Sequence, residues 1–202
     1  MIKLSLRQCQ VLSGTLLGDG NLRISGAGRN ARLRVSHREE DGDYLFWKYQ
    51  ELEPSGLFKS PPFLRKNNGY AIGKLLWSFC SRCDPVLTSY YQLFYPNGKK
   101  IVSREILDGL GELGLAVWYQ DDGSQYRKGG EVILCTEGFG LEGNRIIRKW
   151  FKQSYDLRPR VSSRGRLEFR RVDSQKFLEL TRPYMVSCME RKFRKKELVY
   201  RG

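Results

Sequence analysis

The stretch LAVWYQDDG, from Leu115 to Gly123, runs from apolar residues directly into two adjacent acids. An earlier stretch, LSGTLLGDG from Leu12 to Gly20, has the same order: apolar residues at helical spacing, then an acid and a glycine. Asp19 and Asp122 hold equivalent places in the two stretches, about 100 residues apart. The chain therefore contains an internal repeat, and each copy begins with one of these two motifs.

The residues after each motif repeat a common order of strands and helices. We expect strands over 21–24, 31–36, 124–127 and 131–136, and middle helices over 43–52 and around 146–151. Hairpins are predicted to join 63–65 to 70–72 through Asn67-Asn68-Gly69, and 160–161 to 167–169 through 162–165. Asp84, which precedes Pro85, and Asp173 are the expected N-caps of the closing helices.

Runs of paired strands separated by helices favour antiparallel sheets and an α+β fold class. We expect two pseudo-symmetric αββαββα halves. Residues 1–97 would form the N-terminal half, 98–102 the linker and 103–202 the C-terminal half.

The composition indicates a polyanionic partner. The chain has 202 residues, with 36 Lys and Arg against 22 Asp and Glu, and its net charge of +14 suits nucleic acid or an acidic membrane surface. No apolar run reaches the ~18 residues of a membrane span, and the N-terminus lacks a signal-peptide pattern, so no membrane partner is expected. Five cysteines without a disulfide pattern fit an intracellular, reducing compartment, either cytoplasm or an organelle matrix. We interpret the lone CxxC, Cys80 and Cys83, as structural.

Each motif places an acid near the negative end of a helix dipole. A glycine directly after a helix is the usual left-handed cap, which would put Asp19 and Asp122 in the last helical turn. Carboxylates are unfavourable there, and a bound divalent metal would resolve the conflict. Gly14 and Gly18 lie on one helix face and would admit a second helix closely, whereas the other motif has Val117 and Asp121 in those positions.

Both motifs resemble the signature of the LAGLIDADG homing endonucleases, and LAVWYQDDG is similar to the second motif of the single-chain, two-motif subgroup. The resemblance covers nearly the whole chain. It implies two motif helices packed at the centre and two antiparallel sheets that form a DNA-binding saddle. It also implies that the last acid of each motif, Asp19 or Asp122, binds divalent metal at a scissile phosphate. Asp121 aligns with a position that is often acidic without being the main ligand.

Hydrolysis of a DNA strand needs an activated water and a stabilised leaving oxyanion, and bound metal ions supply both. Mg²⁺ is the expected metal, because it is hard and shares phosphate and water ligands. Lys100 and Lys192 resemble the late lysines that assist catalysis in the subgroup, and their competitors for that role are Lys99, Arg191 and Lys195. His37 and Glu137 stand where relatives often carry a glutamine that orders water, so they are candidates for the water network.

Polar residues that alternate with apolar ones on the strands are candidates for DNA contact. Arg32 and Arg34 alternate with Leu33 and Val35, and Arg166, Glu168 and Arg170 alternate with Leu167 and Phe169, which puts the polar sets on open sheet faces. Further candidates are Asn21, Arg23, Arg65, Lys66, Gln125 and Arg127. The basic run over 191–196 is expected to add phosphate contacts.

The leading hypothesis is a monomeric, Mg²⁺-dependent, site-specific endonuclease of double-stranded DNA, encoded by an intron as a free-standing enzyme. One alternative is a maturase that binds intron RNA on the same scaffold to assist splicing. Another is a non-cleaving DNA-binding regulator. The presence of Asp19 and Asp122 together with two candidate lysines favours the nuclease.

Overall fold

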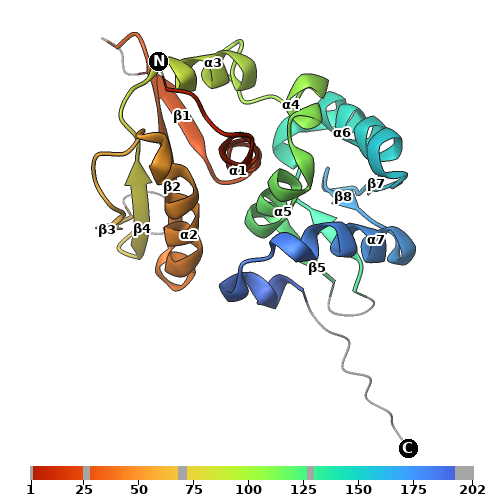
Figure 1. The fold of residues 1–202 in the computed structure, drawn as a ribbon. Coiled ribbons are helices and arrows are strands. Elements are labelled where there is room, and N and C mark those ends of the chain that lie inside the picture. Colours follow the sequence, from red (N-terminus) through yellow and green to blue (C-terminus); the bar gives the residue numbers. More distant parts are fainter. Residues whose placement is uncertain (1, 25–27, 68–71, 127–129, 194–202) are drawn as a thin grey trace, which may run out of the picture.

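Two halves of the same topology make up the protein, as shown by a computed structural model that describes residues 2–24, 28–67, 72–126 and 130–193 (Figure 1). The first half consists of α1 (Leu6–Leu17), β1 (Asn21–Ile24), β2 (Ala31–Arg38), α2 (Gly42–Leu52), β3 (Phe63–Lys66), β4 (Leu75–Cys80) and α3 (Pro85–Phe94). The second half consists of α4 (Arg104–Asp108), α5 (Gly111–Asp122), β5 (Gly123–Gln125), β6 (Val132–Leu134), α6 (Gly140–Tyr155), β7 (Arg160–Val161), β8 (Leu167–Glu168) and α7 (Arg171–Thr181). The predicted α+β class and the internal repeat are confirmed.

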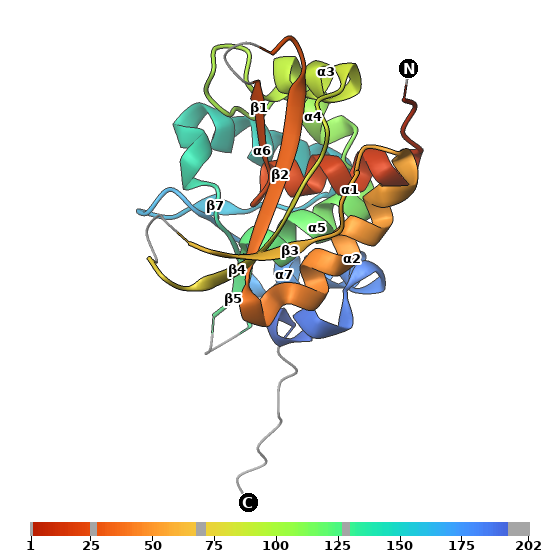
Figure 2. The same ribbon diagram turned by 90° about the vertical axis from the view of Figure 1, so that its left-hand side faces the viewer.

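Each half builds one antiparallel, four-stranded sheet. The strand order is β1-β2-β4-β3 in the first sheet and β5-β6-β8-β7 in the second, so equivalent strands occupy equivalent places. Residues of β2 alternate strictly between buried and exposed from Ala31 to Val35, and α2 and α3 pack on the buried side. One face of each sheet is therefore covered by helices. Seen from the side of the first half, β1 to β4 lie in front of the two central helices (Figure 2).

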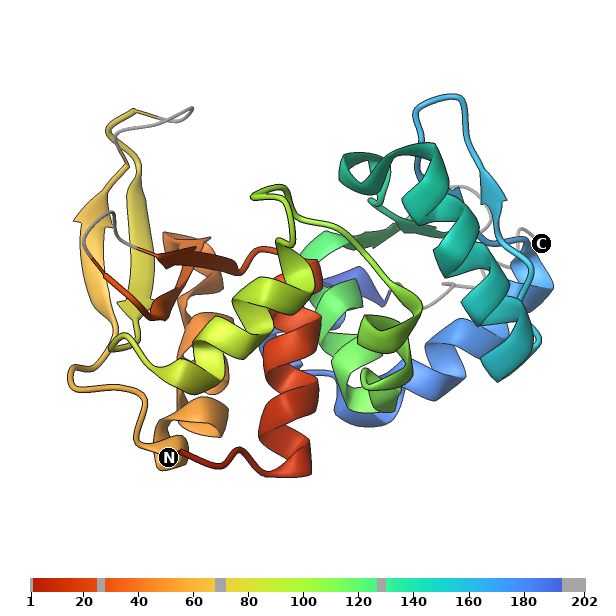
Figure 3. The same ribbon diagram turned by 90° about the horizontal axis from the view of Figure 1, so that it is seen from above.

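The motif helices α1 and α5 lie side by side at the centre, between the two sheets (Figures 1 and 3). A side chain added at Gly14 would overlap the carbonyl oxygen of Gly114, and one added at Gly18 would place its Cβ 2.5 Å from the Asp121 Cβ. This close packing was expected of α1. Helix α5 also approaches its partner through a glycine, although its motif has Val117 and Asp121 at the places of Gly14 and Gly18: a Cβ at Gly114 would lie 2.8 Å from the carbonyl oxygen of Gln10.

The two motif helices end differently. Helix α1 begins with a capping box between Ser5 and Gln8 and ends at Leu17, so Asp19 lies beyond the helix, whereas α5 continues to Asp122. The left-handed caps expected at Gly20 and Gly123 are wrong, since neither glycine has a positive φ. Glycine is required for space instead: a Cβ at Gly20 would lie 2.7 Å from the Thr15 carbonyl oxygen.

Two local predictions for the hairpins and caps also need correction. Strand β4 begins at Leu75 rather than at residue 70. The Asn67 N–H donates to the Lys74 carbonyl (2.8 Å), so the backbone pairing of the hairpin reaches these two residues; between them, 68–71 lie outside the described residues. Helix α7 begins at Arg171, so Asp173 lies in its first turn and accepts the Arg158 N–H (3.1 Å) instead of capping. The cap by Asp84 and the hairpin of β7 with β8 are confirmed.

Residues 95–103 connect the last helix of the first half to α4, and the division of the chain at 98–102 stays a prediction. The five cysteines are free thiols. In the described part of the chain, no helix has both the length and the apolar character required to cross a bilayer.

Candidate active site

Asp19 and Asp122 lie at the same end of the central helix pair, where each motif helix gives way to a strand, and they are close enough for the charge of Asp19 to act on Asp122. Burial raises the pKa of Asp19, and the charge of Asp121 raises it further. Burial and the charges of Asp19 and Asp121 raise the pKa of Asp122 to about 7. The structure therefore gathers three carboxylates whose mutual repulsion the neighbouring lysines do not cancel.

The two predicted lysines bind equivalent points of the two motifs. Lys100 Nζ donates to the carbonyl oxygens of Gly18 (3.1 Å) and Gly20 (2.9 Å), and Lys192 Nζ donates to that of Asp121 (2.8 Å). Gly18 and Asp121 hold the same position in their motifs. Burial lowers the pKa of both lysines.

Their competitors lie elsewhere. Lys99 is exposed, and Arg191 forms an ion pair with Asp41 at 2.7 Å. Lys195 is outside the described residues. The geometry favours Lys100 and Lys192, while their part in catalysis stays a prediction.

The second-half acid opens onto a pocket of about 330 Å³. Asp122, Lys100 and Glu137 line it together with Cys135 and residues at the end of α1. Glu137 Oε1 accepts a hydrogen bond from Arg166 Nε at 2.9 Å, which fixes this carboxylate at the edge of the pocket. An acid, a lysine and a second carboxylate thus surround one cavity.

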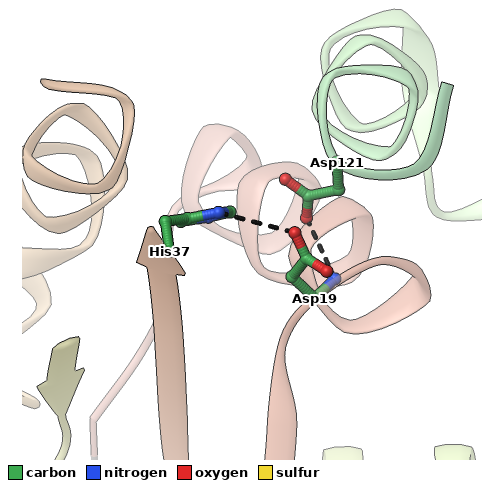
Figure 4. A group of neighbouring side chains, drawn as sticks. All are labelled: Asp19, His37 and Asp121. Carbon is green, nitrogen blue, oxygen red and sulfur yellow. Dashed lines mark hydrogen bonds and ion pairs between the residues drawn. The ribbon is translucent and has the colours of Figure 1, made fainter. Parts of the chain in front are cut away.

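The first-half acid faces His37 (Figure 4). His37 Nδ1 lies 3.5 Å from Asp19 Oδ2, and its Nε2 lies 3.2 Å from Lys48 Nζ. An ammonium group can only donate, so Nε2 accepts and Nδ1 carries the proton that points toward Asp19. Burial and the charge of Lys48 lower the pKa of His37 to about 3, so the ring is neutral at physiological pH.

Asp121 is held by a buried lysine rather than left open. Lys48 Nζ contacts its two carboxylate oxygens at 2.6 and 2.8 Å, and both side chains are fully buried. Asp121 Oδ2 also accepts the backbone N–H of Asp19 at 3.2 Å. Sequence reasoning missed this role of Lys48, although a lysine amid the apolar stripe of Tyr44, Leu45 and Leu52 is itself a signal that a buried acid is nearby.

The donor set fits a divalent cation. Asp19, His37 and Asp121 each offer a ligand atom, and these atoms lie within 4.8 Å of one another. Of the three, Asp19 is the group open to a cation, because Lys48 already occupies both oxygens of Asp121 and His37 Nδ1 carries a proton. Burial and then mutual repulsion raise the pKa of Asp19 and Asp122, and a hard cation would stabilise their carboxylates in the charged form.

In the first sheet, the register places most of the predicted DNA-contacting residues on one open face. Arg23 lies opposite Arg32, and Asn21 lies opposite Arg34. Arg65 shares this face and donates to Ser78 Oγ at 2.9 Å. Lys66 lies opposite Leu75 on the other face, because neighbouring residues of a strand point to opposite sides; it is exposed there, and its contact with DNA stays a prediction.

In the second sheet, the register places one candidate, Gln125, on the core side rather than on the open face. It lies opposite the buried Val132 on the core side, whereas Ser124 and Tyr126 hold the places equivalent to Asn21 and Arg23. Arg127 lies outside the described residues.

The remaining candidates of the second sheet differ in exposure. Glu168 is buried and accepts hydrogen bonds from Tyr126 OH (2.8 Å) and Arg160 Nε (3.1 Å), so it organises the open face. Arg166 is occupied by Glu137, and Arg170 is exposed just before α7.

Comparison with known proteins agrees with this architecture. Residues 9–179 match the model of the LAGLIDADG DNA endonuclease family. The chain is 34% identical over 209 residues to the protein RecA of Mycolicibacterium flavescens, covering 94% of this chain and 47% of that protein. It therefore spans about half the length of this RecA protein and of that of Mycolicibacterium chitae. It is 29% identical over 212 residues to the DNA endonuclease I-ChuI of Chlamydomonas applanata, covering 95% of this chain and 96% of I-ChuI.

Among solved structures, the homing endonuclease I-WcaI bound to its DNA recognition sequence aligns with a TM-score of 0.84 at 22% identity, over 96% of this chain and 88% of I-WcaI. The structure of I-DmoI in complex with DNA and Mn aligns with a TM-score of 0.56 at 13% identity, over 90% of this chain and the whole of that chain. At these identities the likeness concerns the fold.

Proposed function

The chain belongs to the LAGLIDADG DNA endonuclease family, and on that premise we propose that it is a homing endonuclease that hydrolyses both strands of a long, asymmetric DNA site with divalent metal. I-ChuI, which this chain matches over almost its full length, is named a DNA endonuclease. I-WcaI, which shares the fold, was solved with its DNA recognition sequence.

One observation carries the proposal. The two motif acids, Asp19 and Asp122, lie at the same end of α1 and α5. Lys100 binds the carbonyl oxygens on either side of Asp19, and Lys192 binds the carbonyl oxygen just before Asp122. Two acids and two lysines arranged in this way give two sites related by the internal symmetry. This duplication suits two antiparallel strands that must both be cut.

A divalent metal held by Asp19 and Asp122 would activate water and neutralise charge on the phosphate. Mg²⁺ is the proposed ion, because the exposed donors are hard carboxylate oxygens and phosphate and water would complete its ligands. The I-DmoI structures with Mn and Ca support a divalent ion in this fold.

The protein's own groups would orient the reaction. The Nδ1–H of His37 and the carboxylate of Glu137 would position water beside the two acids. In the described structure, two of the three N–H groups of the Lys100 ammonium donate to backbone carbonyls, and one of those of Lys192 does so. Each lysine therefore has an N–H group left for a phosphate oxygen. Because they are anchored at the motif carbonyls, they would stabilise developing charge without reorganising.

The open sheet faces would read the target. Asn21, Arg23, Arg32 and Arg34 form one block in the first sheet, and Ser124, Tyr126, Arg160 and Arg166 lie on the corresponding face of the second. The two blocks differ in sequence, so a chain that acts as a monomer with two unlike halves suits an asymmetric site.

The test is cleavage of a plasmid library of randomised duplex sites in Mg²⁺, with Ca²⁺ and EDTA as parallel conditions. The double variant Asp19→Asn/Asp122→Asn controls for contaminating nuclease. We expect cutting at one discrete family of sites in Mg²⁺ by the wild type alone. A wild type that cuts no duplex while it binds structured RNA would instead support the maturase alternative.

A further inference from the structure

The two metal-binding acids are held in different ways. The N–H of Gly18 donates to the Gly14 carbonyl (3.1 Å) and that of Gly20 to the Thr15 carbonyl (2.7 Å), so the backbone of α1 satisfies both groups. Between them, the N–H of Asp19 donates to a side chain of the other motif helix, the carboxylate of Asp121, at 3.2 Å. Asp122 needs no such support, because α5 continues through it.

Asp121 is itself fixed by Lys48 of α2. Their ion pair has distances of 2.6 and 2.8 Å and is fully buried on both sides. Lys48 Nζ also lies 4.5 Å from the centre of the Tyr44 ring, whose hydroxyl donates to the Val117 carbonyl at 3.2 Å. A buried charge pair with this many contacts has little freedom to move, so Asp121 presents its oxygen to Asp19 from a fixed place.

The second half has no counterpart of this pair among its described residues. The motif position of Asp121 is Gly18 in α1. The middle helix α2 buries Leu45, Lys48 and Leu52, and α6 buries Asn144, Ile147 and Phe151 at the same spacing. An apolar Ile147 thus stands where α2 carries the buried lysine.

We propose that Lys48 and Asp121 are positioning residues for Asp19, so that cleavage of one DNA strand depends on them and cleavage of the other does not. The inference rests on the proposed nuclease function and deepens it, by making the two sites chemically unequal. The pair replaces the helical backbone that α1 lacks at Asp19. Its loss should move the carboxylate of Asp19 while leaving that of Asp122 in place.

The experiment uses a duplex with each strand carrying a different end label, so that the two cleavage rates are measured separately. Asp19→Asn first identifies the strand that depends on Asp19. Lys48→Met alone would leave Asp121 as an unpaired buried charge, so two charge-neutral double variants are compared: Lys48→Met/Asp121→Asn and Lys48→Met/Asp121→Leu. Only the asparagine keeps an oxygen that can accept the Asp19 N–H.

We expect Lys48→Met/Asp121→Leu to slow the Asp19-dependent strand by roughly 10–100-fold, the usual effect of removing a group that orients a metal ligand. The other strand should stay within about threefold of wild type. The asparagine variant should recover much of the loss. Ile147→Met, at the matching place of α6, should leave the ratio of the two rates unchanged.

Equal slowing of both strands in a variant that melts like wild type and binds the duplex in Ca²⁺ would overturn the proposal. So would equal, strand-selective slowing in the asparagine and leucine variants, because the hydrogen bond to Asp19 would then not matter. Failure of the nuclease function itself is distinguishable, since the wild type would then cut neither strand.

Discussion

Gly14 of α1 faces Val117 of α5 so closely that a Cβ at Gly14 would lie 2.9 Å from the Val117 Cβ. These residues hold the same position in the two motifs, as do Gly18 and Asp121, which also face each other. Residues near the symmetry axis meet their own counterparts, and two side chains would not fit there. The repeat is therefore obliged to be unequal at its centre, with glycine in one copy.

Gly14→Ala should lower the free energy of unfolding by about 1–3 kcal/mol, because overlap with the Gly114 carbonyl outweighs the better helix propensity of alanine. Urea denaturation measures the change. Gly109→Ala is the matched control, since its Cβ would meet nothing nearer than 3.7 Å, and it should stay within about 0.5 kcal/mol of wild type. A Gly14→Ala variant as stable as this control would contradict the packing.

Lys100→Met should lower the rate of cleavage by about 10-fold or more while the affinity for duplex in Ca²⁺ changes little, because Lys100 is anchored on the motif carbonyls beside Asp122. Lys99→Met removes the same charge from the adjacent, exposed residue. Single-turnover cleavage and filter binding separate the two effects. Equal rate losses in both variants would show that only local positive charge matters.

Arg32→Ala should weaken DNA binding and lower the slope of log affinity against log salt by roughly one unit if the arginine contacts a phosphate. If it reads a base, the loss should concentrate on one position of the target instead. Lys66→Ala removes a charge from the opposite face of the sheet and should leave affinity and slope nearly unchanged. A larger effect of Lys66→Ala than of Arg32→Ala would contradict the assignment of DNA binding to the face that carries Arg32.

The stability of the metal-free protein should depend on pH through Asp122. Its pKa is about 7 in the folded state against 3.8 for an ordinary aspartate, so the unfolded chain loses its proton first as pH rises; the stability of the folded state falls between these values and stays reduced above them. Wild type should therefore lose about 2–4 kcal/mol relative to Asp122→Asn between pH 4 and pH 8 in EDTA.

Unfolding curves of the two proteins at both pH values measure this difference, and excess Ca²⁺ at pH 8 should restore stability to wild type more than to the variant. A difference between the two proteins that does not change with pH would mean that Asp122 carries no unrelieved negative charge.

The local features of the chain were predictable because each depends on nearby residues. The hydrophobic periodicity predicted the helices, and Asp84 before Pro85 predicted a helix cap. The repeated motif predicted two halves with Asp19 and Asp122 at equivalent places. Features that depend on pairing across the fold were not predictable. Nothing local distinguishes the open face at Ser124 from the core side at Gln125, since a shift of one residue reverses the faces.

The site shows the same limit. Lys48 was visible as a lysine on an apolar stripe, but its partner Asp121 lies far away in sequence and comes from the other half. The end of α1 at Leu17, rather than at the motif acid, depends on that partner too, because Asp121 accepts the N–H that a continuing helix would have satisfied.

The most direct test of the central claim, that each half holds the acid for one strand, is the product of each single acid variant on a supercoiled plasmid with one target site. We expect Asp19→Asn and Asp122→Asn each to lose double-strand cutting, with any residual nicks falling on opposite strands. Double-strand cutting by either variant at the wild-type rate, or nicks by both on the same strand, would contradict the account.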